Sequence, residues 1–204
     1  MKIFFMKKII TLVLILVSIT IQSFSQSSTI VISQVYGGGG GGTGTYLFDY
    51  VELHNVSTVT QSLTGFSIQY GSATGQFGST ATNIYVFIAG TSIPAGGYLL
   101  IQCGPTGTSG TPLPVTPDFV TGNLNMGQAS GKVALANQVA ALGCGATATP
   151  CTLPHAAIID LVAWGTSNNA EGGASVNNGV AITSTQGCVR KTLGCTDTNN
   201  NNLD

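Results

Sequence analysis

Tyr46-Leu47-Phe48-Asp49-Tyr50-Val51-Glu52-Leu53-His54-Asn55 is the stretch that decides the fold class, because aliphatic side chains alternate in it with aromatic and polar ones. A period of two residues is the signature of a β-strand that has one face in a core and the other face outside it. An aliphatic face favours burial, so we expect Leu47, Val51 and Leu53 to point into the core.

Seven further runs rich in β-branched and aromatic residues are also predicted to be strands, and clusters of Gly, Pro, Asn and Ser separate them. They are Thr29–Tyr36, Leu63–Tyr70, Asn83–Ala89, Tyr98–Cys103, Lys132–Asn137, Ala157–Trp164 and Cys188–Lys191. No segment beyond the N-terminal region keeps a helical period for more than two turns. About eight short strands with turn signals at this spacing predict an all-β sandwich or barrel.

The N-terminal region predicts export. Three lysines flank the apolar run Ile9–Ile21, which is followed by the small-x-small motif Ser23-Phe24-Ser25. This pattern is typical of a secretory signal peptide, and the run is shorter than the roughly 20 residues that a membrane span needs. We therefore expect residues 1–25 to be cleaved, no membrane span to be retained, and the protein to be extracellular or at the cell surface.

Charge disfavours nucleic acid as a partner of this domain. Without the predicted signal peptide, three basic residues face seven acidic ones, for a net charge of about −4. Binding to a phosphate backbone rests largely on neutralisation by Lys and Arg, which such a chain is poorly equipped to provide.

Five cysteines in an exported chain imply disulfides. Two bridges among five cysteines allow fifteen pairings, but local spacing favours Cys144–Cys151 and Cys188–Cys195, which leaves Cys103 free. None of these spacings is a zinc motif, and the two histidines are isolated in the sequence.

Two loops stand out between the predicted strands. The glycine run Gly37–Gly42 lacks the lysine and the following helix of a phosphate-binding loop, so we interpret it as a flexible connection. The proline-rich segment Cys103–Phe119 predicts a long irregular loop, and exposed loops of this length often carry binding functions.

The acidic residues do not form a recognisable catalytic pair. Asp49 and Glu52 are three apart on one strand, so they point to opposite faces and are expected to accept N–H groups from a neighbouring loop. Asp160 lies in an apolar strand, where an unpaired charge is costly, so we expect it to face solvent or cap a turn. No serine or cysteine has a histidine nearby in a known triad order. We therefore predict no enzymatic activity for residues 26–204.

The clearest metal lead is the Asn-rich segment at residues 193–204. Asp197, Asn199, Asn201 and Asp204 space oxygen ligands as a calcium loop does, although the central Gly and final Glu of an EF-hand are missing. We therefore predict that these four residues form a calcium site. The rest of the segment is typical of a tail or linker. The chain stops within it, which suggests continuation beyond Asp204.

Several segments together resemble the lamin-tail domain family, in the form found in bacterial exported proteins. They are Ile30–Tyr36 before the glycine run, Asp49–Asn55, Leu63–Ile68, Ile93–Ile101, Gly131–Leu135, Asp160–Gly165, Glu171-Gly172, Arg190-Lys191 and the Asp197–Asp204 spacing. Two departures are Gln34, where the family usually has an acid, and Phe66, where it usually has Trp.

This resemblance implies an immunoglobulin-like β-sandwich over residues 26–192, followed by the tail or linker at 193–204. It also implies a non-catalytic extracellular binding or tethering module without a cofactor, whose partner is a cell-surface polymer or protein. Such domains accompany exported nucleases, phosphatases and surface proteins. The alternative is therefore an N-terminal accessory domain of a larger secreted endonuclease, exonuclease or phosphatase-type hydrolase, with its catalytic part beyond Asp204.

Overall fold

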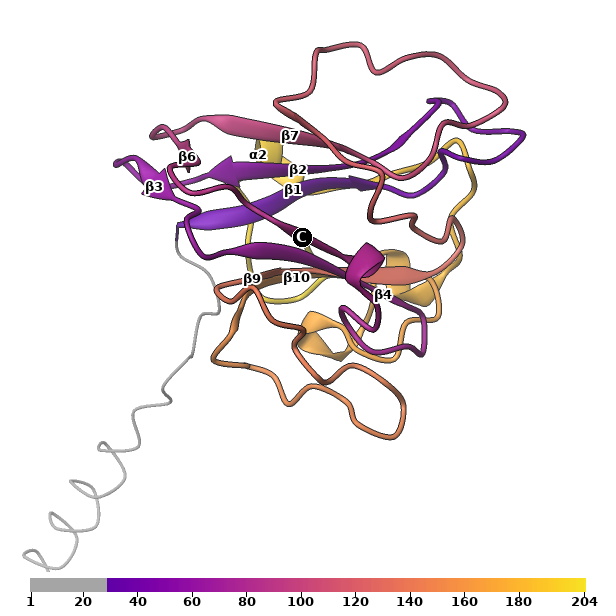
Figure 1. The fold of residues 1–204 in the computed structure, drawn as a ribbon. Coiled ribbons are helices and arrows are strands. Elements are labelled where there is room, and N and C mark those ends of the chain that lie inside the picture. The colour runs from indigo at the N-terminus through magenta and orange to yellow at the C-terminus, as the bar shows by residue number, and fades with distance from the viewer. Residues whose placement is uncertain (1–28) are drawn as a thin grey trace, which may run out of the picture.

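The computed structural model describes residues 29–204, and the predicted signal peptide lies outside them. Two sheets form the layers of a sandwich (Figure 1). The larger sheet has the strand order β11-β1-β2-β7-β8, the smaller has the order β10-β9-β4-β5, and β3 pairs separately with β6. This architecture confirms the predicted all-β sandwich.

The strands are β1 (Ile30–Tyr36), β2 (Asp49–Asn55), β3 (Gln61–Ser62), β4 (Ser67–Ser72), β5 (Ile84–Val86), β6 (Ser92–Ile93), β7 (Tyr98–Cys103), β8 (Phe119–Val120), β9 (Gly131–Ala136), β10 (Ile158–Trp164) and β11 (Cys188–Val189). Single helical turns lie at η1 (Ala81–Asn83), η2 (Glu171–Gly173), η3 (Asn177–Gly179) and α2 (Lys191–Gly194). All eight predicted runs overlap a strand. The three missed strands, β3, β6 and β8, are two residues long, too short to show a period.

The core between the sheets follows the alternation in β2. Val51 and Leu53 are fully buried, as predicted, whereas Leu47 precedes the strand and is half-buried. The same core takes in Trp164 of the smaller sheet and the half-buried Phe66. Its other members include Ile32, Val35, Leu63, Ile68, Tyr70, Phe87, Ile93, Ile101, Leu124, Val133 and Leu135. Asp49 is buried and Glu52 half-exposed, in line with the predicted placement on opposite faces.

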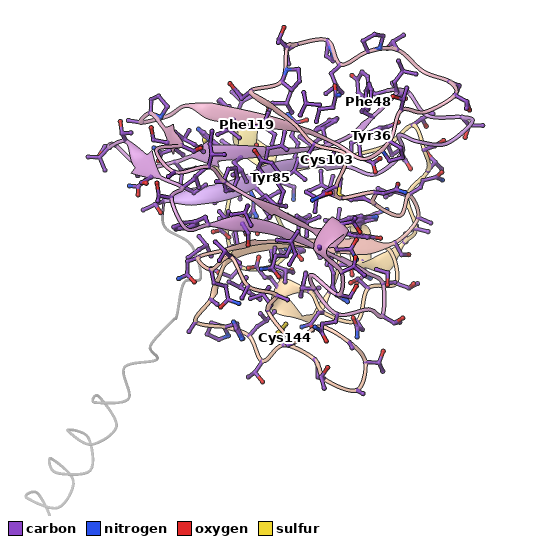
Figure 2. The ribbon with its side chains drawn as sticks, viewed as in Figure 1. Tyr36, Phe48, Tyr85, Cys103, Phe119 and Cys144 are labelled. Carbon is purple, nitrogen blue, oxygen red and sulfur yellow. A yellow bond between two sulfur atoms is a disulfide. The ribbon has the colours of Figure 1, made fainter. Side chains whose placement is uncertain are left out.

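The outer faces of the two sheets differ. Behind the smaller sheet, Phe77, Leu161 and Cys151 form a second apolar cluster with residues of β9 and β10. The connection between β9 and β10 covers that face. Figure 2 shows Cys144 in this connection, on the side away from the larger sheet. Its disulfide joins Cys144 to Cys151, which confirms that predicted pair. The smaller sheet is therefore covered on both faces.

The second predicted disulfide, Cys188–Cys195, is wrong. Cys188 faces inward from β11 and is buried in the main core, while Cys195 follows α2, is exposed and lies 3.9 Å from His54 Nδ1. Two thiols on opposite sides of one sheet cannot bridge without backbone movement. Cys103 is free, as predicted, and buried.

The glycine run is packed at its start rather than being a freely flexible connection. A Cβ on Gly38 would lie 2.3 Å from the Ser184 carbonyl oxygen, and one on Gly39 would lie 2.2 Å from the Phe48 carbonyl carbon. The Tyr36 hydroxyl, labelled with Phe48 in Figure 2, donates to Ser184 O at 2.6 Å. Gly38 and Gly39 therefore serve close packing.

Asp49 ties this loop to the body of the sandwich. One carboxylate oxygen accepts the Gly39 N–H at 2.9 Å and the other accepts the Met126 N–H at 2.7 Å. This confirms that Asp49 accepts backbone N–H groups from loops. Burial raises the pKa of Asp49 to about 7, although both hydrogen bonds favour the charged form.

A pH dependence of stability follows from Asp49. Because its pKa is raised in the folded state, the folded chain holds more protons than the unfolded chain between about pH 4 and pH 7. The free energy of unfolding should therefore fall by about 2 kcal/mol from pH 5 to pH 7 through this group. Urea unfolding of the wild type and Asp49→Asn at both pH values measures it. Equal pH dependence in the two proteins would refute the assignment.

Candidate functional site

The outer face of the larger sheet carries a strip of hydrogen-bonded polar side chains. A β-bulge in β1 makes Ser33 an extra residue, so that both Ser33 and Gln34 reach Glu52 on β2. Ser33 Oγ donates to Glu52 Oε1 at 2.7 Å, and Gln34 Nε2 donates to the same oxygen at 3.1 Å. Tyr50 in turn donates to Gln34 Oε1 at 3.1 Å. The amide at position 34 thus donates to Glu52, which a carboxylate could not do.

Two open depressions meet at this strip. One, of about 480 Å³, extends toward α2 and is walled by Tyr98. The other, of about 140 Å³, extends toward the proline-rich loop and is walled by Tyr46 and Tyr50. Gln34 and Glu52 line both depressions, so the two adjoin on this sheet face, and we call the pair the outer groove.

His54 stands beside the outer groove and is not isolated in space. Its ring stacks on Tyr98 with centroids 4.1 Å apart, and the Tyr98 hydroxyl donates to Leu193 O at 2.6 Å. His54 Nδ1 lies 3.2 Å from Gly194 O and 3.9 Å from Cys195 Sγ. A hydrogen bond to Gly194 O requires a proton on Nδ1, which then has no lone pair for the thiol. This contact therefore does not make a Cys–His nucleophile.

At one edge of the sandwich, four carboxylates gather around Arg190, and we call Asp160, Glu171, Asp197 and Asp204 the acidic cluster. Arg190 Nη2 is 2.9 Å from both oxygens of Asp160, and Nη1 is 3.0 Å from Asp204 and 3.4 Å from Asp197. These contacts are the three salt bridges of the described residues. One guanidinium therefore forms salt bridges with three carboxylates.

The prediction that Asp160 faces solvent or caps a turn is wrong. Asp160 is 1% exposed, and a bulge between Ile158 and Asp160 in β10 turns its side chain toward the other sheet. There it also accepts the N–H of Ile32 in β1, beside the bulge of that strand. Burial raises the pKa of Asp160, and the Arg190 guanidinium opposes this rise. The charge is tolerated because it is paired.

Glu171, in η2, is the least satisfied member of the acidic cluster. It is 3% exposed; Oε2 accepts from Asn201 Nδ2 at 3.2 Å, whereas Oε1 has no hydrogen-bond partner. Asp197 Oδ2 is likewise buried without a partner. Burial and the neighbouring acids Asp160 and Asp197 raise the pKa of Glu171 to about 9.

The four predicted calcium ligands do not converge on one point. Asp197 and Asp204 bind Arg190, while Asn201 is buried against β10, accepting the Ala163 N–H at 3.0 Å and donating to Leu161 O at 2.7 Å. The Asn199 N–H donates to Asp197 Oδ1 at 3.1 Å. The segment 193–204 therefore lies against the sandwich, which differs from the expected tail or linker.

Asp160 and Glu171 were not predicted as partners of this segment. Their side chains come together with Asp197, such that one oxygen from each of the three lies within 4.8 Å of the others. The sequence signal that could have found them is an acid in an apolar strand together with a single downstream arginine.

Comparison with known proteins adds the family. A family model described as Lamin Tail Domain matches residues 23–166, which reach past the end of β10. No curated protein matches the chain. Within residues 29–204, no helix is long and apolar enough to cross a membrane.

Proposed function

The chain belongs to the lamin tail domain family, whose domains are immunoglobulin-like and non-catalytic, and we propose that it is an extracellular binding or tethering module. Its partner is a cell-surface polymer, specifically a polysaccharide, held in the outer groove. The observation that carries the proposal is the hydrogen-bonded group of Gln34, Tyr50 and Glu52 on an uncovered sheet face.

The chemistry of the outer groove supports a sugar chain. Amide, carboxylate and hydroxyl groups can exchange hydrogen bonds with sugar hydroxyls. Tyr46, Tyr50 and Tyr98 line the groove with aromatic rings that carry a polar tip, which suits a ligand that is apolar on its ring faces and polar at its rim. The two depressions also adjoin at Gln34 and Glu52, so that an extended polymer could occupy both.

The placement of the basic residues weighs against nucleic acid. Lys132 is buried and bound to four oxygens, and Arg190 is buried in the acidic cluster. Of the three basic residues within 29–204, this leaves Lys191 as the exposed cation. Such a surface cannot supply the counterion release that drives phosphate binding.

Retention on insoluble polysaccharides tests the proposal. We expect the domain to bind at least one of cellulose, chitin or peptidoglycan, and Tyr50→Ala to weaken that binding about tenfold, because it removes a ring and the hydroxyl that orients Gln34. Val86→Ala, an exposed truncation on β5 in the other sheet, is the control and should bind as wild type. Retention of none of the three polymers, or equal retention of both variants, would defeat the proposal.

The accessory-domain alternative stays a prediction. A module that binds a polymer through the outer groove would also bring an attached hydrolase to that polymer. A different result would favour a direct contact with a catalytic domain. In that case Tyr50→Ala would bind the polysaccharide normally, but the activity of an attached hydrolase would be lost.

A further inference from the structure

The acidic cluster has too little positive charge for its carboxylates. Four acids meet one guanidinium, and the three salt bridges of the described residues are all made by Arg190. The next basic residue, Lys191, directs Nζ to the Leu203 carbonyl oxygen instead. With all four acids ionised, the cluster has a net charge of about −3 in a buried setting, where uncompensated charge is costly.

Two oxygens of the cluster are buried without a hydrogen-bond donor. They are Glu171 Oε1 and Asp197 Oδ2, and Glu171 is 97% removed from solvent. An unsatisfied buried acceptor costs about 1–3 kcal/mol, and more when it is charged. Such a group in a folded protein calls for a partner, which can be an ion, a proton or a buried water.

The spacing of the oxygens fits one cation. Asp160, Glu171 and Asp197 each offer an oxygen within 4.8 Å of the other two. Calcium binds oxygen at about 2.3–2.6 Å, so two oxygens on one calcium ion lie no more than about 5 Å apart. The donor set is oxygen alone, which suits calcium and not zinc or copper.

We propose that Asp160, Glu171 and Asp197 bind a calcium ion that fastens the C-terminal segment to β10 and η2. This ligand set shares Asp197 with the four residues expected from the sequence and replaces the other three. The ion brings the charge of the acidic cluster from about −3 to about −1.

The site would join parts of the chain that lie far apart in the sequence. Asp160 comes from β10, Glu171 from the turn after it, and Asp197 from the segment beyond α2. Calcium therefore should act mainly on stability and on the docking of residues 197–204.

Thermal unfolding of the full chain after EDTA treatment and dialysis tests the site. At a free calcium concentration about a hundred times the dissociation constant, we expect the melting temperature to rise by about 5–10 °C. Isothermal calorimetry should show one ion per chain, and magnesium at the same concentration should give a smaller shift because its octahedral geometry is stricter.

Glu171→Gln separates binding from folding. The glutamine retains an oxygen that can accept from Asn201 and loses one charge, so this variant should fold without calcium and melt at or above the calcium-free wild type, with no calcium shift. Asp118→Asn, which changes an exposed acid whose oxygen accepts the Leu100 N–H, should keep the full shift. A wild type without a calcium shift or heat, as expected if Glu171 and Asp197 share a proton, would overturn the proposal. An equal shift in Glu171→Gln would do the same, and an equal magnesium shift would overturn the assignment to calcium.

Discussion

Arg190→Met is expected to lower the free energy of unfolding by about 5 kcal/mol or more, which approaches the entire stability of an ordinary domain. The variant leaves Asp160 as an unpaired carboxylate that is 1% exposed. It also removes the hydrogen bonds from Arg190 to the carbonyl oxygens of Ile32 at 3.1 Å and Thr196 at 3.0 Å. Because Arg190 joins β1, β10 and the C-terminal segment, we expect the edge of the sandwich to open.

Fluorescence of Trp164, the single tryptophan of the chain, reports this loss directly. Its ring is 1% exposed and its N–H donates to Gly127 O at 3.1 Å, so unfolding in urea should shift its emission strongly. Lys191→Met removes the adjacent, exposed cation and should cost less than about 1 kcal/mol. Adding Asp160→Asn to Arg190→Met should restore part of the loss, because the unpaired charge is gone. An Arg190→Met protein within 1 kcal/mol of wild type would show that the cluster is not structural.

Lys132→Met should cost about 4 kcal/mol for a related reason. Lys132 is fully buried in β9, and its ammonium lies within 3.2 Å of the carbonyl oxygens of Ser72, Ala73 and Gly145 and of Asn168 Oδ1. Burial lowers its pKa to about 8, so the group is mostly charged at pH 7. Methionine fills a similar volume but leaves four acceptors without their donor, each of which costs about 1 kcal/mol or more.

Asn168→Ala is the matched comparison for Lys132→Met, since it removes one of the four acceptors and leaves the ammonium in place. Its cost should be about 1 kcal/mol, measured by the same urea unfolding. If Lys132→Met proves no more destabilising than Asn168→Ala, the carbonyl oxygens are satisfied by other means and the ammonium is not what joins these turns.

Local patterns were enough to predict most of the sandwich. The alternation around Val51 and Leu53 identifies the inward face of β2, and the short spacing of Cys144 and Cys151 identifies their disulfide. Both depend on residues that are close in the sequence. The order of segments also identified the family, which the match to the Lamin Tail Domain model confirms.

Features that depend on bulges and on distant pairing could not be predicted in this way. Asp160 meets Arg190 because β10 bulges and β11 pairs with β1, neither of which leaves a sequence signal. The pairing of Cys188 with Cys195 failed because spacing does not tell which side of a strand a thiol faces. Asn201 was expected in a tail or linker. Its side-chain amide is instead buried and forms hydrogen bonds with the backbone of β10.

The position of β11 and of the segment after it has a consequence for aggregation. β1 gains its outer partner from Cys188 and Val189, and β10 gains Asn201 as a side-chain partner for its backbone. Without residues 188–204, β1 is an open edge, and the outer edge of β10 keeps only its short pairing with Val176, so both can pair with another chain. A copy that lacks residues 188–204 would leave both strands without these partners, and we expect it to be more prone to aggregation than the full chain.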